Sequence, residues 1–244
     1  MEIKTAYTEK DFADIRHIWE ERFTTDNIWL NTLFQQILPL CRSYIYILEG
    51  KAVSAISLMP MKFVSPGTAP LKGFYLFGVA TLQTFEGKRL AAKLILHASG
   101  ILATEGYDFI FERPANQSLN KYYFNLGFTI SLPKVPHRFQ FIENAEKAAP
   151  FIENNCSPEN THRNPEAKTL SEAVLDNIRI EHPTRFEWKD RKLLEGLIHL
   201  GELREHIKSY SPTPNKAETY IAVKPLHQMD SQIFKETFFC FPME

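Results

Sequence analysis

The stretch FYLFGVATLQTFEGKRLAAKLILHASGILATEGYDFIFERPANQSLNKYYFNLGF, residues 74–128, decides how this chain folds. Residues 71–82 form an almost unbroken apolar run rich in Phe, Tyr, Leu and Val, which predicts a strand buried on both faces. Gly78 lies inside this run, and glycine weakens a strand. We therefore expect a β-bulge at Gly78, or a place where a ligand approaches the backbone.

A helix is predicted after the loop 83–87. Lys88 and Arg89 stand at its start, where the positive end of the helix dipole disfavours cations. Either an anion bound to the free N–H groups of the first turn offsets this conflict, or Glu86 and solvent screen it. The helix itself is indicated by apolar residues that recur at three- and four-residue steps: Leu90, Ala91, Leu94, Ile95, Ala98, Ile101 and Leu102.

A second strand and a second helix complete the stretch. The compact apolar run 107–112 predicts the strand. Asn116 or Ser118 can cap the short helix that follows, and Gly127 suits the position just past its end. Tyr123 lies on that helix, between Tyr122 and Phe124.

This order of elements resembles the acyl-CoA-binding half of the GNAT superfamily of N-acetyltransferases. The order matches over about residues 1–143, and the match is specific across 74–128. The family usually has Arg or Gln where Glu86 stands and Gly where Arg89 stands. A carboxylate at position 86 would repel a pyrophosphate unless it turns away. The matching residues are Val79-Ala80-Thr81 on the strand, Glu86-Gly87-Lys88-Arg89-Leu90-Ala91 in the loop, and Asn116 with Tyr123-Phe124-Asn125-Leu126-Gly127-Phe128.

The resemblance implies an α/β (mixed α+β) fold of the acyl-CoA N-acyltransferase type, with a central mixed, mostly antiparallel sheet flanked by helices. Residues 1–143 are expected to form this GNAT-like domain. The polar, Pro- and Asn-rich stretch 144–168 is expected to be a linker or long surface loop. Residues 169–244 are expected to form a small C-terminal α+β domain that resembles a truncated GNAT-like copy.

Local patterns predict the remaining elements. Thr8 to Asp11 resembles a capping box that opens a helix, and a second helix is expected from about Asp26 until Pro39 ends it. Further strands are expected at 3–7, 42–48, 52–64, 129–132 and 138–142. In the C-terminal part we expect helices near 170–178 and 193–198, and strands at 218–223 and 232–241 that run antiparallel.

The resemblance implies direct transfer of an acetyl group from acetyl-CoA, as co-substrate, to a primary amine of a small molecule or peptide. Tyr123 falls on the position that protonates the leaving thiolate in the family. A phenol, with a pKa of about 10, is protonated at neutral pH and can serve as that donor. The expected coenzyme contacts are Val79, Ala80, Thr81, Gly87, Lys88, Arg89, Leu90, Ala91, Ala92 and Asn116; Asn116 can also act as a helix cap.

The sequence leaves several alternatives for the general base and gives only candidate contacts for the acceptor. The strand 71–82 carries no Asp or Glu. Glu112, Asp26, the C-terminal Glu244 and a water relay are the alternatives for the base. In a GNAT-like fold the connection between the first two helices borders the acceptor site, so Phe23, Asp26 and Trp29 are candidate substrate contacts. Phe23 and Trp29, taken singly, are more often core residues.

The composition excludes several other classes of function. The net charge of −1 predicts neither a nucleic-acid nor a membrane partner, and a homodimer stays open. Three scattered cysteines without C-x-x-C, and eight histidines without H-E-x-x-H, predict no metal site. No signal peptide or membrane-spanning run is present, so a cytoplasmic protein is expected. Two rivals remain: a catalytically weak or inactive acyl-CoA-binding regulatory module, and a protein-interaction domain.

Overall fold

The computed structural model describes residues 2–23, 26–132, 185–189, 192–193, 196–197, 200, 221–229, 234 and 238–239. The main elements in chain order are β1 (Glu2–Thr5), α1 (Glu9–Arg22), α2 (Asn27–Thr32), β2 (Arg42–Leu48), β3 (Lys51–Val64), β4 (Leu71–Thr81), α3 (Leu90–Thr104), β5 (Phe109–Glu112), α4 (Asn120–Phe124), β6 (Ile130–Leu132), β7 (Arg185–Trp188), β8 (Ile221–Pro225) and β9 (Phe238–Phe239).

The first four strands form an antiparallel meander, in which each strand pairs with the next one along the chain. The α1–α2 pair connects β1 to β2, and short loops make the other two connections. The predicted hairpin of β2 and β3 is confirmed. Its turn residues Glu49 and Gly50 both have positive φ, at 51° and 76°. That is the left-handed geometry that a two-residue type I′ turn requires.

The sheet becomes mixed at β5, which lies parallel to β4. A parallel neighbour needs a crossover connection, and α3 supplies it. The strand order is β1-β2-β3-β4-β5-β8-β6, with β7 and β9 joined to the side of β3. The predicted fold class, a mixed and mostly antiparallel sheet flanked by helices, is therefore confirmed.

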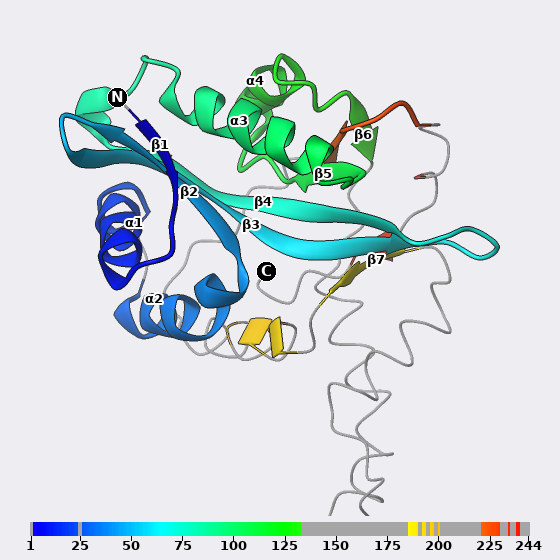
Figure 1. The fold of residues 1–244 in the computed structure, drawn as a ribbon, viewed down its shortest axis with the longest axis horizontal. Helices are drawn as coiled ribbons and strands as arrows, with labels where there is room; N and C mark the ends of the chain where they lie inside the picture. Colours follow the sequence, from blue (N-terminus) through cyan, green and yellow to red (C-terminus); the bar gives the residue numbers. More distant parts are fainter. Residues whose placement is uncertain are drawn as a thin grey trace, which may run out of the picture.

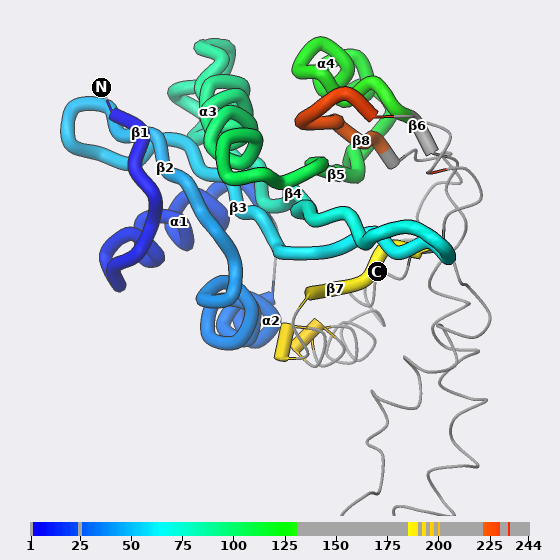
Figure 2. The backbone as a smooth tube through the Cα atoms, turned by 45° about the vertical axis from the view of Figure 1, so that its right-hand side comes forward, coloured from blue at the N-terminus to red at the C-terminus, as the bar shows by residue number. Residues whose placement is uncertain are grey.

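Helices cover both faces of this sheet. Figures 1 and 2 show α3 and α4 on one face and α1 and α2 on the other. Each face has its own buried apolar cluster: Ile15 of α1 packs with Met59, whereas Leu94 of α3 packs with Leu58. Neighbouring residues of β3 thus serve opposite faces, as the two-residue period of a strand requires.

The two N-terminal helices begin at their predicted caps. The Thr8 side chain accepts from the Asp11 N–H, and the Asp11 carboxylate accepts from the Thr8 N–H, which confirms the capping box. Asp26 is the N-cap of α2. The chain then widens into a π-helical turn, Leu33–Ile37, and tightens into a 3-10 turn, Leu38–Leu40, that contains Pro39.

The described residues after 184 join the same sheet. β7 pairs with the second half of β3, and β8 lies between β5 and β6. β8 is antiparallel to both of its neighbours, and β9 lies parallel to β7. Among the described residues β8 and β9 are not paired with each other, so their expected antiparallel arrangement stays a prediction. Residues 192–193, 196–197 and 200 are helical, in agreement with the helix expected near 193–198.

Several expectations for residues 138–244 lie outside the described residues. They concern the strand at 138–142, the stretch 144–168, the helix near 170–178 and the carboxylate of Glu244. The division into two domains therefore stays a prediction. Within the described part of the chain, no helix is long and apolar enough to cross a membrane.

Candidate active site

The candidate site opens where β4 and β5 separate. Their parallel pairing begins at Gly73 and Phe109 and ends at Leu76 and Glu112. β4 then continues to Thr81, while β5 stops at Glu112. The backbone of β4 beyond Leu76 therefore has no β5 partner in the described residues, and a pocket of about 530 Å³ lies beside it.

The bulge predicted at Gly78 is present. Ala55 pairs with Ala80 but Ser57 pairs with Phe77, so β4 carries one residue more than β3 across this step. Gly78 has φ +59°, and a Cβ built on it would lie 1.8 Å from the Trp19 ring. Only glycine fits this position, for reasons of both backbone conformation and space.

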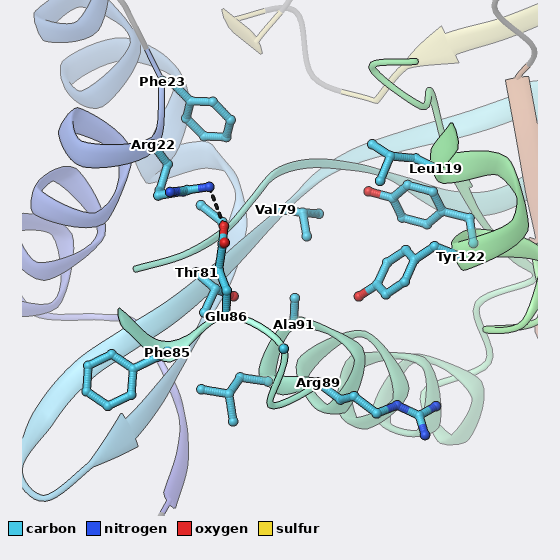
Figure 3. Close-up of a pocket in the computed structure, with 14 residues that line it drawn as sticks. Arg22, Phe23, Val79, Thr81, Phe85, Glu86, Arg89, Ala91, Leu119 and Tyr122 are labelled. Atoms are coloured by element: carbon cyan, nitrogen blue, oxygen red, sulfur yellow. Dashed lines mark hydrogen bonds and ion pairs between the residues drawn. The ribbon is translucent and has the colours of Figure 1, made fainter. Parts of the chain in front are cut away.

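Four segments supply the walls of the pocket: the end of α1, the bulged part of β4, the loop before α3, and α4. Figure 3 shows Arg22 and Phe23 on one side and Tyr122 on the other, with Val79 between them. The lining residues are Arg22, Phe23, Val79, Ala80, Thr81, Phe85, Glu86, Gly87, Arg89, Leu90, Ala91, Leu119, Tyr122 and Tyr123.

The start of α3 lies beside this pocket, since Leu90 and Ala91 are among its lining residues. After the 3-10 turn Gln83–Phe85, Gly87 has φ +73° and Arg89 has φ +57°, and α3 starts at Leu90. No side chain caps this helix start. The first turn of a helix has N–H groups without intrahelical partners, and these groups favour an anion.

Glu86 does not face such an anion alone, because Arg22 of α1 donates to its carboxylate. Both side chains are partly exposed, at 29% for Arg22 and 51% for Glu86. The neighbouring Glu21 carboxylate accepts the backbone N–H of Gln83 at 2.7 Å. The last turn of α1 is thus fastened to the loop, and the negative charge at position 86 is balanced by a cation.

Two adjacent tyrosines of α4 form the opposite wall. Their rings lie 5.1 Å apart and edge-on. Tyr123 is buried, and this burial raises the pKa of its phenol, with the nearby Glu112 adding to the shift. Tyr122 is less buried, and burial raises the pKa of its phenol too. Both phenols therefore stay protonated at neutral pH and act as hydrogen-bond donors.

Glu112 closes the end of β5 and is only 1% exposed. Burial raises the pKa of its carboxyl group to about 9, and its Oε1 has no hydrogen-bond partner among the described residues. At neutral pH the group is a neutral carboxylic acid. A neutral acid donates a proton but does not accept one, and Glu112 does not line the pocket.

A known protein family covers the part of the chain that forms this pocket. Residues 3–131 match the sequence model of a family described as acetyltransferase (GNAT) domain. The match covers more than half of the chain. The chain belongs to the GNAT acetyltransferase family. No curated protein sequence matches it significantly.

Several solved structures are similar to this chain. A probable N-acyltransferase from Enterococcus faecalis is 11% identical, with 50% of this chain and 32% of that chain covered and a TM-score of 0.44. Eis1 from Mycobacterium abscessus is 11% identical, with coverage of 91% and 51% and a TM-score of 0.49. YhbS from Escherichia coli, solved with CoA, is 16% identical, with coverage of 50% and 66% and a TM-score of 0.40. The chain thus spans about a third to two thirds of their lengths.

The structure brings most of the expected GNAT coenzyme residues to one place. Val79, Ala80, Thr81, Gly87, Arg89, Leu90 and Ala91 all line the pocket. Lys88, Ala92 and Asn116 do not: the Lys88 ammonium lies 4.8 Å from the centre of the Phe85 ring, and the Asn116 amide oxygen accepts from Ser118. Asn116 makes no capping hydrogen bond, so its expected role as a side-chain cap is wrong.

Of the three expected acceptor contacts, one lines the pocket and two do not. Phe23 lines the pocket. Asp26 instead caps α2 by accepting from the N–H groups of Ile28 and Trp29, at 2.7 and 3.2 Å. Trp29 packs against the apolar cluster beneath the sheet. Their roles toward an acceptor stay predictions.

Sequence reasoning did not single out Arg22, Phe85, Leu119 or Tyr122 as lining residues. A basic residue in the last turn of a helix is ordinarily a complement to the helix dipole, so Arg22 gave no signal of its own. Tyr122 could have been proposed from its place next to Tyr123. Across the described residues, no group of three His, Cys, Asp or Glu side chains is placed to hold a metal ion.

Proposed function

We propose that the protein transfers an acetyl group from acetyl-CoA directly to a primary amine of a small molecule or peptide. The observation that carries this proposal is the pocket itself. It joins an uncapped helix start, a bulged strand end and a buried tyrosine, which are the three parts that binding a phosphorylated thioester and releasing a thiolate require.

The loop and the start of α3 suit the pyrophosphate. Backbone N–H groups of Leu90 and Ala91 are available there, and both residues line the pocket. Because Arg22 balances Glu86, the carboxylate does not oppose an anion with an unpaired charge. The acyl end would then lie at the bulge, where backbone N–H groups can donate to the thioester oxygen.

The chemistry needs no covalent enzyme intermediate. The neutral amine nitrogen attacks the thioester carbon, a C–N bond forms, and the C–S bond breaks. The attacking nitrogen loses one proton to a base. The departing thiolate accepts a hydrogen bond from the protonated Tyr123 phenol, and solvent, which has taken up the proton of the amine, supplies the proton that makes the free thiol. The products are the acetylated amine and CoA with its free thiol.

Water is the base that suits this pocket best. Phe23, the predicted acceptor contact that lines the pocket, offers no group that could take the proton of the amine. Glu112 is neutral at neutral pH, and Glu86 is already paired with Arg22. A chain of water molecules can carry the proton to solvent.

A second candidate function is binding of an acyl-CoA without turnover. One observation favours it: among the described lining residues, Glu86 is the only carboxylate, and it is ion-paired. This reading and the leading one predict the same coenzyme binding and differ only in turnover.

Calorimetric titration of the full chain with acetyl-CoA and, separately, with CoA tests the shared part. We expect a dissociation constant in the micromolar range, about −8 kcal/mol. The absence of binding at millimolar ligand would contradict both the acetyltransferase and the acyl-CoA-binding module, and would favour a protein-interaction domain. Release of free thiol with a panel of primary amines then separates the enzyme from the binding module.

A further inference from the structure

The last turn of α1 holds the bulged end of β4 by a specific hydrogen bond. The indole N–H of Trp19 donates to the carbonyl oxygen of Gly78 at 3.1 Å. Trp19 is only 3% exposed, and its ring occupies the space that a Gly78 side chain would need. The bond joins residues 59 positions apart and fixes the orientation of one peptide plane within the bulge.

That peptide plane carries the N–H of Val79. In a trans peptide the C=O and the N–H point in opposite directions, and the described chain contains no cis peptide. With its C=O turned toward Trp19, the Gly78–Val79 peptide directs the Val79 N–H away from α1. Neither Gly78 nor Val79 has a register partner on β3, and Val79 lines the pocket.

We propose that Trp19 is a positioning residue for acyl transfer: its indole N–H holds the Gly78 carbonyl so that the Val79 N–H donates to the thioester oxygen of the bound acyl-CoA. The inference rests on the proposed function, since it assumes that an acyl-CoA occupies the pocket. A donor fixed before the reaction stabilises the oxyanion of the transition state at no reorganisation cost.

The hydrogen bond can be separated from the packing of the ring. Phe23, Phe34 and Phe77 each meet the Trp19 ring edge-on, at 5.7, 5.4 and 5.6 Å between ring centres. These contacts hold the ring in place whether or not its N–H donates. A substitution that removes only the N–H therefore loosens the Gly78 peptide and leaves the aromatic cluster assembled.

Two variants of the full chain remove the N–H. Trp19→Phe keeps an aromatic ring, and replacement of Trp19 by benzothienylalanine keeps the whole bicyclic shape with sulfur in place of N–H. The readout is the infrared carbonyl band of bound acetyl-CoA labelled with carbon-13 at the thioester carbon. A hydrogen bond to this oxygen lowers the frequency of the band, so the measurement needs no knowledge of the acceptor.

We expect both variants to bind acetyl-CoA within about twofold of the wild type, because one neutral donor contributes little to ground-state affinity. The carbonyl band should move to higher frequency in both. Turnover with any amine that the wild type accepts should fall about tenfold in kcat with little change in KM, as expected for weakening, not removal, of one oxyanion donor.

Phe34→Leu is the matched control, since it removes one of the edge-on ring contacts of Trp19 and keeps the indole N–H that donates to Gly78. It should lower stability without moving the band. An unmoved band in both Trp19 variants overturns the proposal, and so does a band that moves in Trp19→Phe but not in the isosteric variant. If the wild type binds no acetyl-CoA at all, the proposed function itself fails, and that result is distinct from either of these.

Discussion

The two walls of the pocket differ in the charge of their side chains at neutral pH. The polar wall, formed by Arg22, Glu86 and Gly87, is open to solvent, and its one carboxylate is ion-paired. The aromatic wall, formed by Leu119, Tyr122 and Tyr123 with Glu112 behind it, holds titratable groups whose pKa values are all raised by burial. One wall therefore carries charges at neutral pH, and the other carries neutral hydrogen-bond donors.

For the proposed function, this difference favours the polar wall for the phosphates of an acyl-CoA and the aromatic wall for its thioester. Phosphates are stable where water and cations remain, because burial of an unpaired charge is costly. A thioester and a departing thiolate gain most from fixed donors in a dry environment, where hydrogen bonds are strongest. We therefore expect substitutions on the polar wall to change affinity and those on the aromatic wall to change turnover or the response to pH.

The largest effect is expected on the aromatic wall. Tyr123→Phe removes the donor to the thiolate and should lower kcat about 100-fold, the lower end of what general acid catalysis contributes. The dissociation constant for acetyl-CoA should stay within about twofold, because the ring and its packing against Phe128 are kept. Thiol release and calorimetry measure the two quantities.

The neighbouring tyrosine is the matched control for that experiment. Tyr122→Phe makes the same chemical change in the same pocket and should leave kcat nearly unaltered. A large loss in Tyr122→Phe together with a small one in Tyr123→Phe would transfer the donor role to Tyr122.

The next effect concerns stability and pH. The pKa of Glu112 is about 9 in the folded protein, against 4.5 for the ordinary group, so between these values the folded state keeps a proton that the unfolded state has lost. The free energy of unfolding therefore falls as pH rises through this window. Glu112→Gln removes the titrating group and should gain on the order of 2 kcal/mol relative to the wild type between pH 5 and pH 6.5.

Chemical denaturation at several pH values measures this difference. Glu20→Gln, a change of an exposed carboxylate on α1, is the control and should leave the pH profile parallel to that of the wild type. If the Glu112→Gln and wild-type profiles were also parallel, the carboxyl group would be ionised in the folded protein and the neutral character of the aromatic wall would be wrong.

On the polar wall, Arg22→Ala leaves Glu86 unpaired beside the predicted pyrophosphate site. Acetyl-CoA should bind about fivefold more weakly, near 1 kcal/mol, as expected for a partly exposed charge, and the loss should shrink at high salt. Adding Glu86→Gln should restore most of the affinity. Lys10→Ala breaks an exposed ion pair of the same helix far from the loop and serves as control. Failure of the double variant to recover would mean that Arg22 itself contacts the coenzyme.

The smallest effect is expected at Arg89, which holds φ +57° where the family usually has glycine. Arg89→Gly should raise the free energy of unfolding by about 0.5–1 kcal/mol, because a left-handed conformation is unfavourable for a residue with Cβ. Lys88→Gly, one position earlier and without positive φ, should instead lower stability. Thermal unfolding compares the two, and equal shifts would show that the left-handed geometry costs nothing here.

Much of the fold was accessible from local sequence patterns. The apolar run 71–82, the three- and four-residue period of α3 and the Glu49-Gly50 turn each depend on residues within a few positions of one another. The bulge at Gly78 followed from a glycine where a strand disfavours one, and the candidate role of Tyr123 from the resemblance to the GNAT family. The parallel pairing of β9 was not accessible, because a two-residue contact between distant segments leaves no period to detect.

The sequence by itself determined the order of helices and strands, the start of α3 and the presence of the candidate tyrosine, because local spacing and backbone conformation carry that information. Only the tertiary structure decided that Glu86 is paired with Arg22, 64 positions away, that Glu112 is neutral, and that the Gly78 carbonyl is held by Trp19. The physical reason is common to all three. Ionisation and hydrogen bonding depend on which distant groups surround an atom and how far they exclude water, and neither quantity is set by its neighbours along the chain.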